Sequence, residues 1–389
     1  MIALEKFCRA PGGLPENIRL AGLIVALLGV RLALYGVATG SVVGLAHEIC
    51  RWDCYWYTYT ARNGYDVSAF TSAAEFGKAN WAFFPVFPML LRVVALVFPI
   101  SYPAAGLLIA NISLGMFVFV AVKYLALLRP DVNGVALVVF LLAFPGGFYL
   151  SLQYSESIYA ALTVSMLYLL RRDRLFGASV LSAVLTATRV TGILLLPVLV
   201  LKYLAPVYRN WMMGERALAR RALLAAVLPI LLAPAGLFLF MAYLYGHAGD
   251  ALAFMHVQAG WGRGHEFPLF VLGENLFVFD FNMFSSHVSQ TPLIAEWSAL
   301  AGLAMSFYLW RQARYMETWL LLMSVLLPLS TGLASMQRFV LANPVFMIFL
   351  FDLMERTRLR RWFCAIMAIC VVAQLCLIHF WTNDYAILV

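Results

Sequence analysis

Residues 104–128, AAGLLIANISLGMFVFVAVKYLALL, decide the fold class of this chain, because they form an apolar run with a single charge, Lys123. About 20 helical residues of this kind cross the hydrocarbon core of a bilayer, which is ~30 Å thick. Similar runs recur along the chain, whose 389 residues are 63% hydrophobic and 12% charged. Soluble domains carry roughly 25% charged residues. We therefore expect an all-α, polytopic membrane protein that forms a single integral membrane domain, residues 1–389.

Basic residues gather between the apolar runs. They form RRDR at 171–174, ERTRLRR at 355–361 and a basic segment from 202 to 221. Cytoplasmic loops of membrane proteins carry such an excess of arginine and lysine. The formal net charge of +8 is therefore explained by membrane orientation, and we expect no nucleic-acid partner.

Placing the basic segments inside predicts about eleven transmembrane helices, with the amino terminus inside and the carboxyl tail outside. The first apolar run is about long enough to span, so we expect a retained helix and not a cleaved signal peptide. The segment 82–99 carries prolines and Arg92, which favours an interfacial or re-entrant piece over a full crossing. The expected spans are residues 18–40, 104–128, 135–151, 154–170, 175–187, 189–204, 222–245, 293–311, 317–333, 339–353 and 362–381. Two external loops, 41–82 and 246–292, flank a span module at 83–245 and precede C-terminal spans at 293–381.

Polar residues then gather on the predicted outer side of the membrane. Transporters instead tend to place charges and broken helices near the bilayer midplane, and they often show inverted repeats, of which we find none. We therefore expect chemistry at the outer face. The outer polar residues are His47, Glu48, Asp53, Asp66, Glu156, Arg189, Asp250, His256, Gln258, Arg263, His265, Glu266 and Arg338.

The most polar and ring-rich outer stretch is RWDCYWYTYTARNGYD, residues 51–66. Asp53 suits the first turn of a helix and Gly64 suits the position just after its end. Such a helix lies along the membrane surface with Trp56 on one face and Tyr57 on the next. One interpretation is a capping aspartate in an aromatic belt. The other is a catalytic base, because partial desolvation raises the proton affinity of a carboxylate.

A metal site is a third interpretation of this stretch. Structural zinc sites usually show closer cysteine and histidine pairs, so we expect no metal and no other cofactor. The six cysteines, at 8, 50, 54, 364, 370 and 376, are too scattered for a disulfide framework. The candidate ligands for a metal are His47, Glu48, Cys50, Asp53 and Cys54.

An ordered set of motifs points to a family. The set is RWDCYWYTYTARNGYD, NWAFFPVFP, FPGGFYLSLQYSES, ATRVTG, GDALAFMHVQAGWGR and SMQRF. Over about residues 31–345 it resembles the PIG-V mannosyltransferases, the GPI mannosyltransferase 2 branch of the GT-C glycosyltransferases. The chain departs from the family at residues 336–339, where a Pro–Arg–Tyr-like version is expected. It is also short for the eukaryotic enzymes, which favours a bacterial relative in the cell membrane over one in the endoplasmic reticulum.

The resemblance implies a GT-C fold with a large first external loop, interfacial helices and a base carboxylate, which falls on Asp53. It also implies a sugar donor linked to polyprenyl or dolichyl phosphate. The acceptor would be a lipid or glycolipid, and need not be a GPI precursor. Phosphate leaves as an anion, so positive charge serves it better than a general acid. One base therefore suffices for inverting transfer at the non-cytoplasmic face, unlike the paired carboxylates of glycoside hydrolysis.

Further candidate residues follow from the same motifs. Arg189 is the first candidate for binding the donor phosphate, followed by Arg338 and Arg263, although each also suits a snorkelling or solvated arginine. Arg31 either faces the cavity or pairs with a carboxylate. Glu156 either binds sugar hydroxyls or begins a helix. The candidates for binding sugar or acceptor are Glu156, Trp56, Tyr57, Trp81, Gln258, Trp261 and His265.

Other functions remain open at this stage. A polytopic transporter or flippase of a lipid or polar solute is the main alternative, and a small membrane scaffold is another. Within the enzyme class, the donor sugar is mannose only by resemblance, and arabinose or glucose is an alternative.

Overall fold

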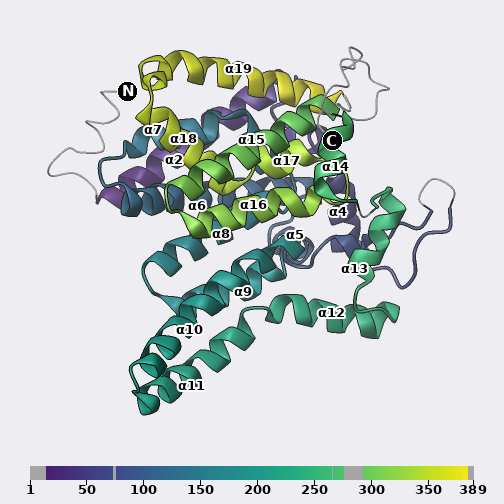
Figure 1. The fold of residues 1–389 in the computed structure, drawn as a ribbon. Coiled ribbons are helices and arrows are strands. Elements are labelled where there is room, and N and C mark those ends of the chain that lie inside the picture. Colours follow the sequence, from purple (N-terminus) through teal and green to yellow (C-terminus); the bar gives the residue numbers. More distant parts are fainter. Residues whose placement is uncertain (1–14, 73–75, 265, 276–291, 384–389) are drawn as a thin grey trace. The chain divides into compact units, whose positions relative to one another are not determined.

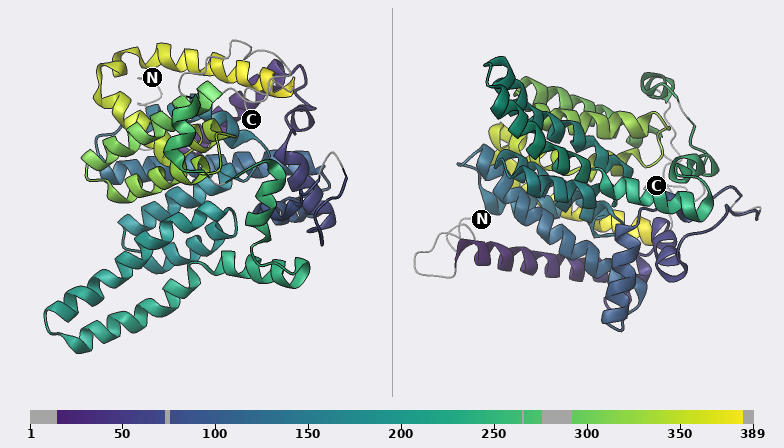
Figure 2. Two further views of the ribbon diagram at one scale, coloured as in Figure 1. Left: turned by 45° about the vertical axis from the view of Figure 1, so that its right-hand side comes forward. Right: turned by 90° about the horizontal axis from the view of Figure 1, so that it is seen from below.

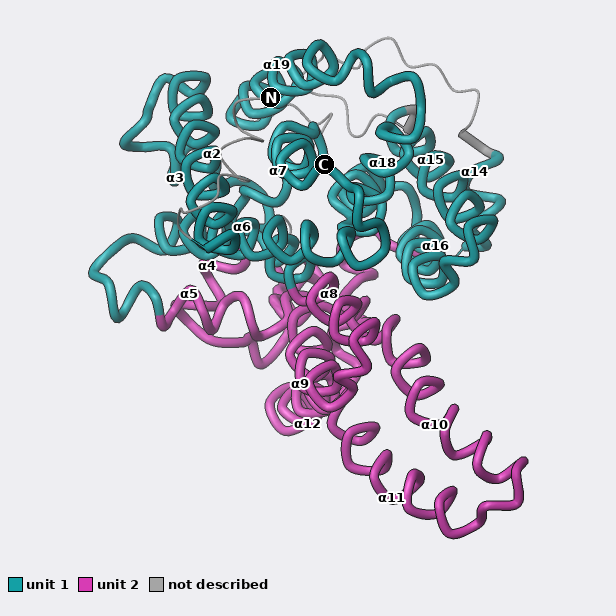
Figure 3. Tube along the Cα trace, turned by 90° about the vertical axis from the view of Figure 1, so that its left-hand side faces the viewer, with its two compact units in different colours: residues 1–55, 94–161, 265–389 teal, residues 56–93, 162–264 magenta. Residues whose placement is uncertain are grey.

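A computed structural model describes residues 15–72, 76–264, 266–275 and 292–383, and within these residues it contains helices and no strand (Figure 1). The all-α prediction is confirmed for this part of the chain. We expected a single domain, and the packing of the chain forms two compact units (Figure 3). Unit 1 comprises residues 1–55, 94–161 and 265–389, and unit 2 comprises residues 56–93 and 162–264.

Unit 1 contains most of the long helices. It also contains the start of α4 and α8, which continue into unit 2. Its elements are α2 (Glu16–Ala38), α3 (Leu45–Glu48), α4 (Asp53–Asn63), α6 (Tyr102–Leu128), α7 (Gly134–Ala143), η2 (Pro145–Ser151), α8 (Glu156–Arg171), α14 (Pro268–Asn275), α15 (Pro292–Arg311), α16 (Tyr315–Leu329), α17 (Met336–Leu341), α18 (Pro344–Arg356), η5 (Arg358–Trp362) and α19 (Phe363–Thr382).

Unit 2 is built around a run of shorter helices. Within it, α10 and α11 lie side by side as an antiparallel hairpin that contains the basic segment 202–221 (Figure 2). Its elements are η1 (Asn80–Ala82), α5 (Val86–Val97), α9 (Leu175–Thr186), η3 (Val190–Leu195), α10 (Leu196–Met212), α11 (Arg216–Leu232), α12 (Ala235–Ala248), α13 (Ala253–His256) and η4 (Val257–Trp261).

The apolar run at 104–128 forms most of α6, and local chemistry sets where that helix begins. The Ser101 side chain accepts a hydrogen bond from the backbone N–H of Ala104, and Pro103 stands in the first turn, where it costs no helical hydrogen bond. Pro145 has the opposite effect on α7, because proline cannot continue a helix, and the chain bends there by 75° into η2.

In the described residues, four helices are long and apolar enough to cross a membrane, or up to six if each bent pair is one span. They include α2 and α6, which correspond to two of the expected spans. Other expected spans, such as α9 and α16, are shorter apolar helices. The count of eleven and the interfacial placement of α5 therefore stay predictions.

Arg31 holds the turn after α7 in place within unit 1. Its guanidinium donates to the Gly147 carbonyl at 2.6 Å and to Gln374 Oε1 at 3.1 Å, and it also donates to the Tyr35 hydroxyl. Gln374 in turn donates to the Phe144 carbonyl. These partners are all uncharged, so the expected pairing of Arg31 with a carboxylate is not seen in the described part of the chain. The expectation that Arg31 faces a cavity stays a prediction.

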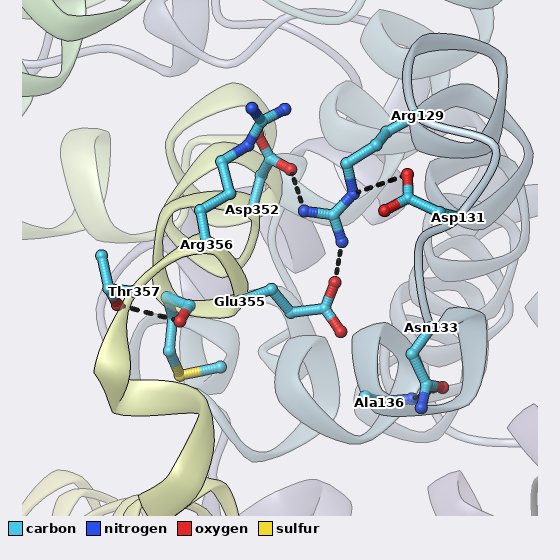
Figure 4. Close-up of polar contacts among 9 residues, drawn as sticks. Arg129, Asp131, Asn133, Ala136, Asp352, Glu355, Arg356 and Thr357 are labelled. Carbon is cyan, nitrogen blue, oxygen red and sulfur yellow. Dashed lines mark hydrogen bonds and ion pairs between the residues drawn. The ribbon is translucent and has the colours of Figure 1, made fainter.

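A second arginine joins the ends of α6 and α18 (Figure 4). Arg129 binds Asp352 at 2.7 Å and also pairs with Glu355 and Asp131. Arg356 reaches back to Asp352 at 2.9 Å. Because Asp352 and Glu355 are nearly buried, these carboxylates depend on the arginines for compensation.

Candidate active site

Asp53 occupies the first position of α4, as the sequence predicts. The helix ends at Asn63, and Gly64 follows with a φ of +82°. Glycine adopts this left-handed conformation without steric cost, so it terminates the helix. The predicted ends of this helix are therefore confirmed, whereas its interfacial placement stays a prediction. The Asp53 side chain is 30% exposed at its start.

Arg338 of α17 bridges two carboxylates within unit 1. Its Nη1 donates to Asp53 Oδ2 at 2.8 Å, and its Nε lies 3.3 Å from Glu156 Oε1 at the start of α8. The side chains of Arg338 and Glu156 are 12% and 9% exposed, so Asp53 is the most accessible of the three. We call Asp53, Glu156 and Arg338 the charged triad.

Aromatic rings enclose the guanidinium of the triad. Its central carbon lies 5.2 Å from the centre of the Tyr154 ring and 5.5 Å from that of Phe339. Burial alone lowers the pKa of Arg338, but the charges of Asp53 and Glu156 raise it by more, so the net shift is upward. The guanidinium therefore stays positively charged between its two carboxylates.

Tyr154 connects the triad to the chain just before Asp53. Its hydroxyl donates to the Arg51 carbonyl at 3.0 Å. Tyr154 is buried, with 1% of its surface exposed, and its phenol acts as a hydrogen-bond donor. Nothing in the motif QYSES marks Tyr154 as part of the site, and sequence reasoning missed it.

The backbone is strained on both sides of the triad. Trp52, which precedes Asp53, has a φ of +50°, and Ser335, the N-cap residue of α17, has a φ of +62°. A non-glycine residue in this region costs on the order of 1 kcal/mol or more. Such conformations persist only where the surroundings hold them. One support is visible at Gly146 of η2, where any Cβ would overlap the Leu341 carbonyl at the end of α17.

Arg338 was expected to bind the donor phosphate, and that role stays a prediction. In the structure its guanidinium is occupied by two carboxylates, which favours positioning of Asp53 instead. Met336 and Gln337, where the chain departs from the family pattern, stand in α17 directly before Arg338. The departure therefore does not remove the arginine from the triad. Glu156 satisfies both of its interpretations, since it begins α8 and also pairs with Arg338.

Unit 2 contains the other described candidates, and two of them meet. Trp56 stacks on Phe83 with ring centres 5.7 Å apart, and Trp261 meets Trp56 edge-on at 5.0 Å. Tyr57 is buried between Phe83 and Phe87. Trp56 and Trp261 thus keep a partly exposed aromatic surface, whereas Tyr57 is a core residue.

The remaining candidates of unit 2 are held by local contacts. Trp81 donates to the Asp66 carbonyl at 2.7 Å and packs on a cluster around Phe240, so its structural role is clear. The Gln258 side chain donates to the Phe254 carbonyl at 3.3 Å. Arg189 is extended at the start of η3, and Arg263 follows the end of η4. Their binding roles stay predictions, and His265 lies outside the described residues.

Cysteine chemistry differs from what the sequence suggests. Cys50 and Cys54 form a disulfide. The prediction excluded a disulfide framework and did not foresee this single bond. The bond also removes two of the five candidate metal ligands, because a disulfide sulfur is not a thiolate. Among the residues that the structure describes, no group of three or more His, Cys, Asp or Glu side chains is placed to hold a metal ion. Cys8 lies outside that part of the chain.

Comparison with known proteins gives matches in sequence. A family model described as Mannosyltransferase (PIG-V) matches residues 31–268. The GPI alpha-1,6-mannosyltransferase 2 of Homo sapiens is 29% identical over 177 residues, which cover 42% of this chain and 33% of the human protein. The chain thus aligns with only about a third of the length of this curated relative.

Two solved structures of the oligosaccharyltransferase of Archaeoglobus fulgidus also align with the chain. The apo form has a TM-score of 0.45 and 10% identity, and it covers 94% of this chain and 56% of its own. The complex with an inhibitory peptide and a dolichol-phosphate has a TM-score of 0.41 and 11% identity, with the same coverage.

Proposed function

The chain belongs to the PIG-V mannosyltransferase family, and from this premise we propose that it is an inverting, GT-C-type glycosyltransferase. It moves a mannosyl or other hexosyl group from a polyprenyl- or dolichyl-phosphate donor to a lipid or glycolipid acceptor. The observation that carries the proposal is the charged triad, because Asp53 falls on the family's motif aspartate and is the most exposed of the three side chains. The apolar helices and the family match identify an integral membrane protein.

Asp53 acts as the base in this mechanism. Its carboxylate accepts the proton of an acceptor hydroxyl while that oxygen bonds to the anomeric carbon of the sugar. The bond from this carbon to the donor phosphate breaks on the opposite side, and the phosphate leaves with the bonding electrons. Arg338 and Glu156 fix the orientation of the carboxylate, since a base must lie within hydrogen-bonding reach of the proton it removes.

The donor phosphate needs a separate cation. The triad contains two carboxylates and one guanidinium, and a net negative group repels phosphate. We therefore assign the phosphate to Arg189 and Arg263, on the strength of their places in the family-like motifs ATRVTG and GWGR. Guanidinium binds phosphate oxygens in pairs, which suits this role.

Aromatic side chains with accessible faces suit sugar rings. We propose Trp56 and Trp261 for the sugar or acceptor, because their rings meet and remain partly exposed. Gln258 is a further proposed ligand from the same loop as Trp261. Tyr57 and Trp81, which are also predicted to bind the sugar or acceptor, pack against neighbouring aromatic rings, and their binding roles stay predictions.

The reaction takes place at the non-cytoplasmic face, with a bacterial cell membrane favoured over the endoplasmic reticulum. Support comes from the basic segments, which orient the chain with the Asp53 loop outside. Nucleotide sugars are scarce on that side, so a lipid-linked donor fits. No metal or other cofactor enters the mechanism.

Purified protein should be incubated with polyprenyl-phosphate mannose, arabinose or glucose and a panel of lipid acceptors, with and without a chelator. We expect transfer from one donor, with inversion, and insensitivity to the chelator. Asp53→Asn should lower kcat by about 10²- to 10⁴-fold and retain the fold. Asp250→Asn, an exposed carboxylate of unit 2, is the matched control and should keep full activity. Absence of transfer to every acceptor, together with lipid or solute flux in vesicles, would establish a transporter instead.

A further inference from the structure

The Cys50–Cys54 disulfide encloses the proposed base. The bond joins residues four apart, and Asp53 lies inside the small ring that it closes, next to Cys54. Both cysteines are buried, at 4% and 1% exposure. A ring this short removes little chain entropy from the unfolded state, so global stabilisation is a minor effect of the bond. Its main effect is on the local backbone.

Hydrogen bonds hold the same segment from outside the ring. The indole N–H of Trp381 donates to the Ile49 carbonyl at 2.9 Å, and the Tyr154 hydroxyl donates to the Arg51 carbonyl. The Arg51 side chain reaches the Thr382 carbonyl at 3.2 Å. These contacts fix both the entry to the ring and its first peptide groups.

The strained residue stands within this ring. Trp52 has a φ of +50°, which a tryptophan adopts only under constraint. This conformation turns the chain so that α4 begins at Asp53. The ring leaves few alternatives to that turn, whereas a free chain would relax it and reorient the carboxylate away from Arg338.

We propose that the Cys50–Cys54 disulfide is a positioning device for Asp53, so that the enzyme is fully active only when this pair is oxidised. The inference rests on the proposed function, with Asp53 as the base. It agrees with a non-cytoplasmic site, because disulfides persist in oxidising compartments and are rare in the cytoplasm. Tyr154 contributes through its hydrogen bond to the Arg51 carbonyl.

Reduction provides the direct test. Dithiothreitol donates two electrons and two protons to the bond, gives two thiols and is itself oxidised to its cyclic disulfide. We expect the reduced enzyme to lose about tenfold or more in kcat, the scale expected when a catalytic group is displaced by a fraction of an ångström. The KM for the lipid-linked donor should stay within about twofold.

Variants distinguish the bond from other cysteines. Cys50→Ser/Cys54→Ser should reproduce the low kcat of the reduced enzyme and no longer respond to dithiothreitol. Cys364→Ser and Cys376→Ser, at exposed free cysteines of α19, should keep both the high kcat and the response. Full kcat in the reduced protein, or a loss that follows the thermal unfolding midpoint, would overturn the positioning role.

A readout that needs no transfer separates this inference from the proposed function. Hydrogen exchange of the peptide covering residues 49–57 should accelerate on reduction, while the peptide covering η2 stays unchanged. If the oxidised enzyme transfers no sugar but this local acceleration appears, the proposed function fails. The disulfide then still fixes the backbone around Asp53. Unchanged hydrogen exchange of residues 49–57 on reduction would overturn the positioning role of the disulfide, whatever the transfer activity.

Discussion

Arg338 is the residue whose removal tests the charged triad most directly. In the wild type its guanidinium forms ion pairs with Glu156, which is nearly buried, and with Asp53, which is 30% exposed. Replacing it by methionine removes the guanidinium that pairs with both carboxylates and lies against the Tyr154 and Phe339 rings. We expect Arg338→Met to destabilise the protein and to lower kcat.

The size of the effect follows from the burial of each partner. Removing one member of a buried ion pair costs about 3–5 kcal/mol, whereas exposed pairs contribute about 0–1 kcal/mol. Glu156 falls near the first case and Asp53 near the second, so we expect about 4 kcal/mol in total for Arg338→Met. In a Glu156→Gln background most of this penalty disappears, and the same substitution should cost about 1–2 kcal/mol. The double-mutant cycle thus predicts a coupling of about 2–3 kcal/mol.

Reversible unfolding in mixed detergent micelles measures the four stabilities, and transfer kinetics are read in parallel. Arg338→Lys keeps the charge but lacks the planar fork that reaches two carboxylates, so it should lower kcat with little change in the donor KM. A coupling below about 0.5 kcal/mol would refute the bridging role. A raised donor KM with unchanged kcat would return Arg338 to phosphate binding.

Two further substitutions test contacts outside the triad. One lies between η2 and α17, and the other lies in the Arg129 network at the C-terminal end of α18. Gly146→Ala forces a Cβ into the Leu341 carbonyl, which should cost about 3 kcal/mol and lower kcat; Gly246→Ala, where nothing lies within 4 Å, should be neutral or stabilising in the same unfolding assay. Arg129→Met removes the cation that pairs with Glu355 and leaves Asp352 with Arg356 alone. Unfolding should become easier by about 3 kcal/mol, and unaltered stability would contradict the role of this network.

Local chemistry in the sequence predicted the elements of the site well. The aspartate and the glycine of RWDCYWYTYTARNGYD gave both ends of α4, because capping preferences act over a few residues. The same reasoning allowed Glu156 to begin a helix. The family match confirms the resemblance that the ordered motifs indicated.

Pairings between distant segments were beyond this reasoning. Asp53 and Arg338 are 285 residues apart, and nothing in one sequence says which arginine a given carboxylate meets. Arg31 illustrates the same limit, since its position inside an apolar helix suggested a cavity or a carboxylate partner, whereas its guanidinium donates to Gly147 and Gln374. The disulfide was missed because the cysteines were judged as a set, although Cys50 and Cys54 stand beside a helix start that brings them together.

The net charge of the triad bears on which residues remove the proton and which bind the donor phosphate in the proposed reaction. One guanidinium between two carboxylates leaves one negative charge, which suits proton removal from a hydroxyl and opposes an anionic donor. A site that used Arg338 for phosphate would have to abandon Glu156, a nearly buried carboxylate, at considerable cost. The proposed function therefore has Arg338 orient Asp53 throughout the catalytic cycle, while other arginines bind the phosphate, because this arrangement keeps the Arg338–Glu156 ion pair intact. Under this division, substitutions of Arg189 and Arg263 should act mainly on the donor KM, and substitutions within the triad should act mainly on kcat.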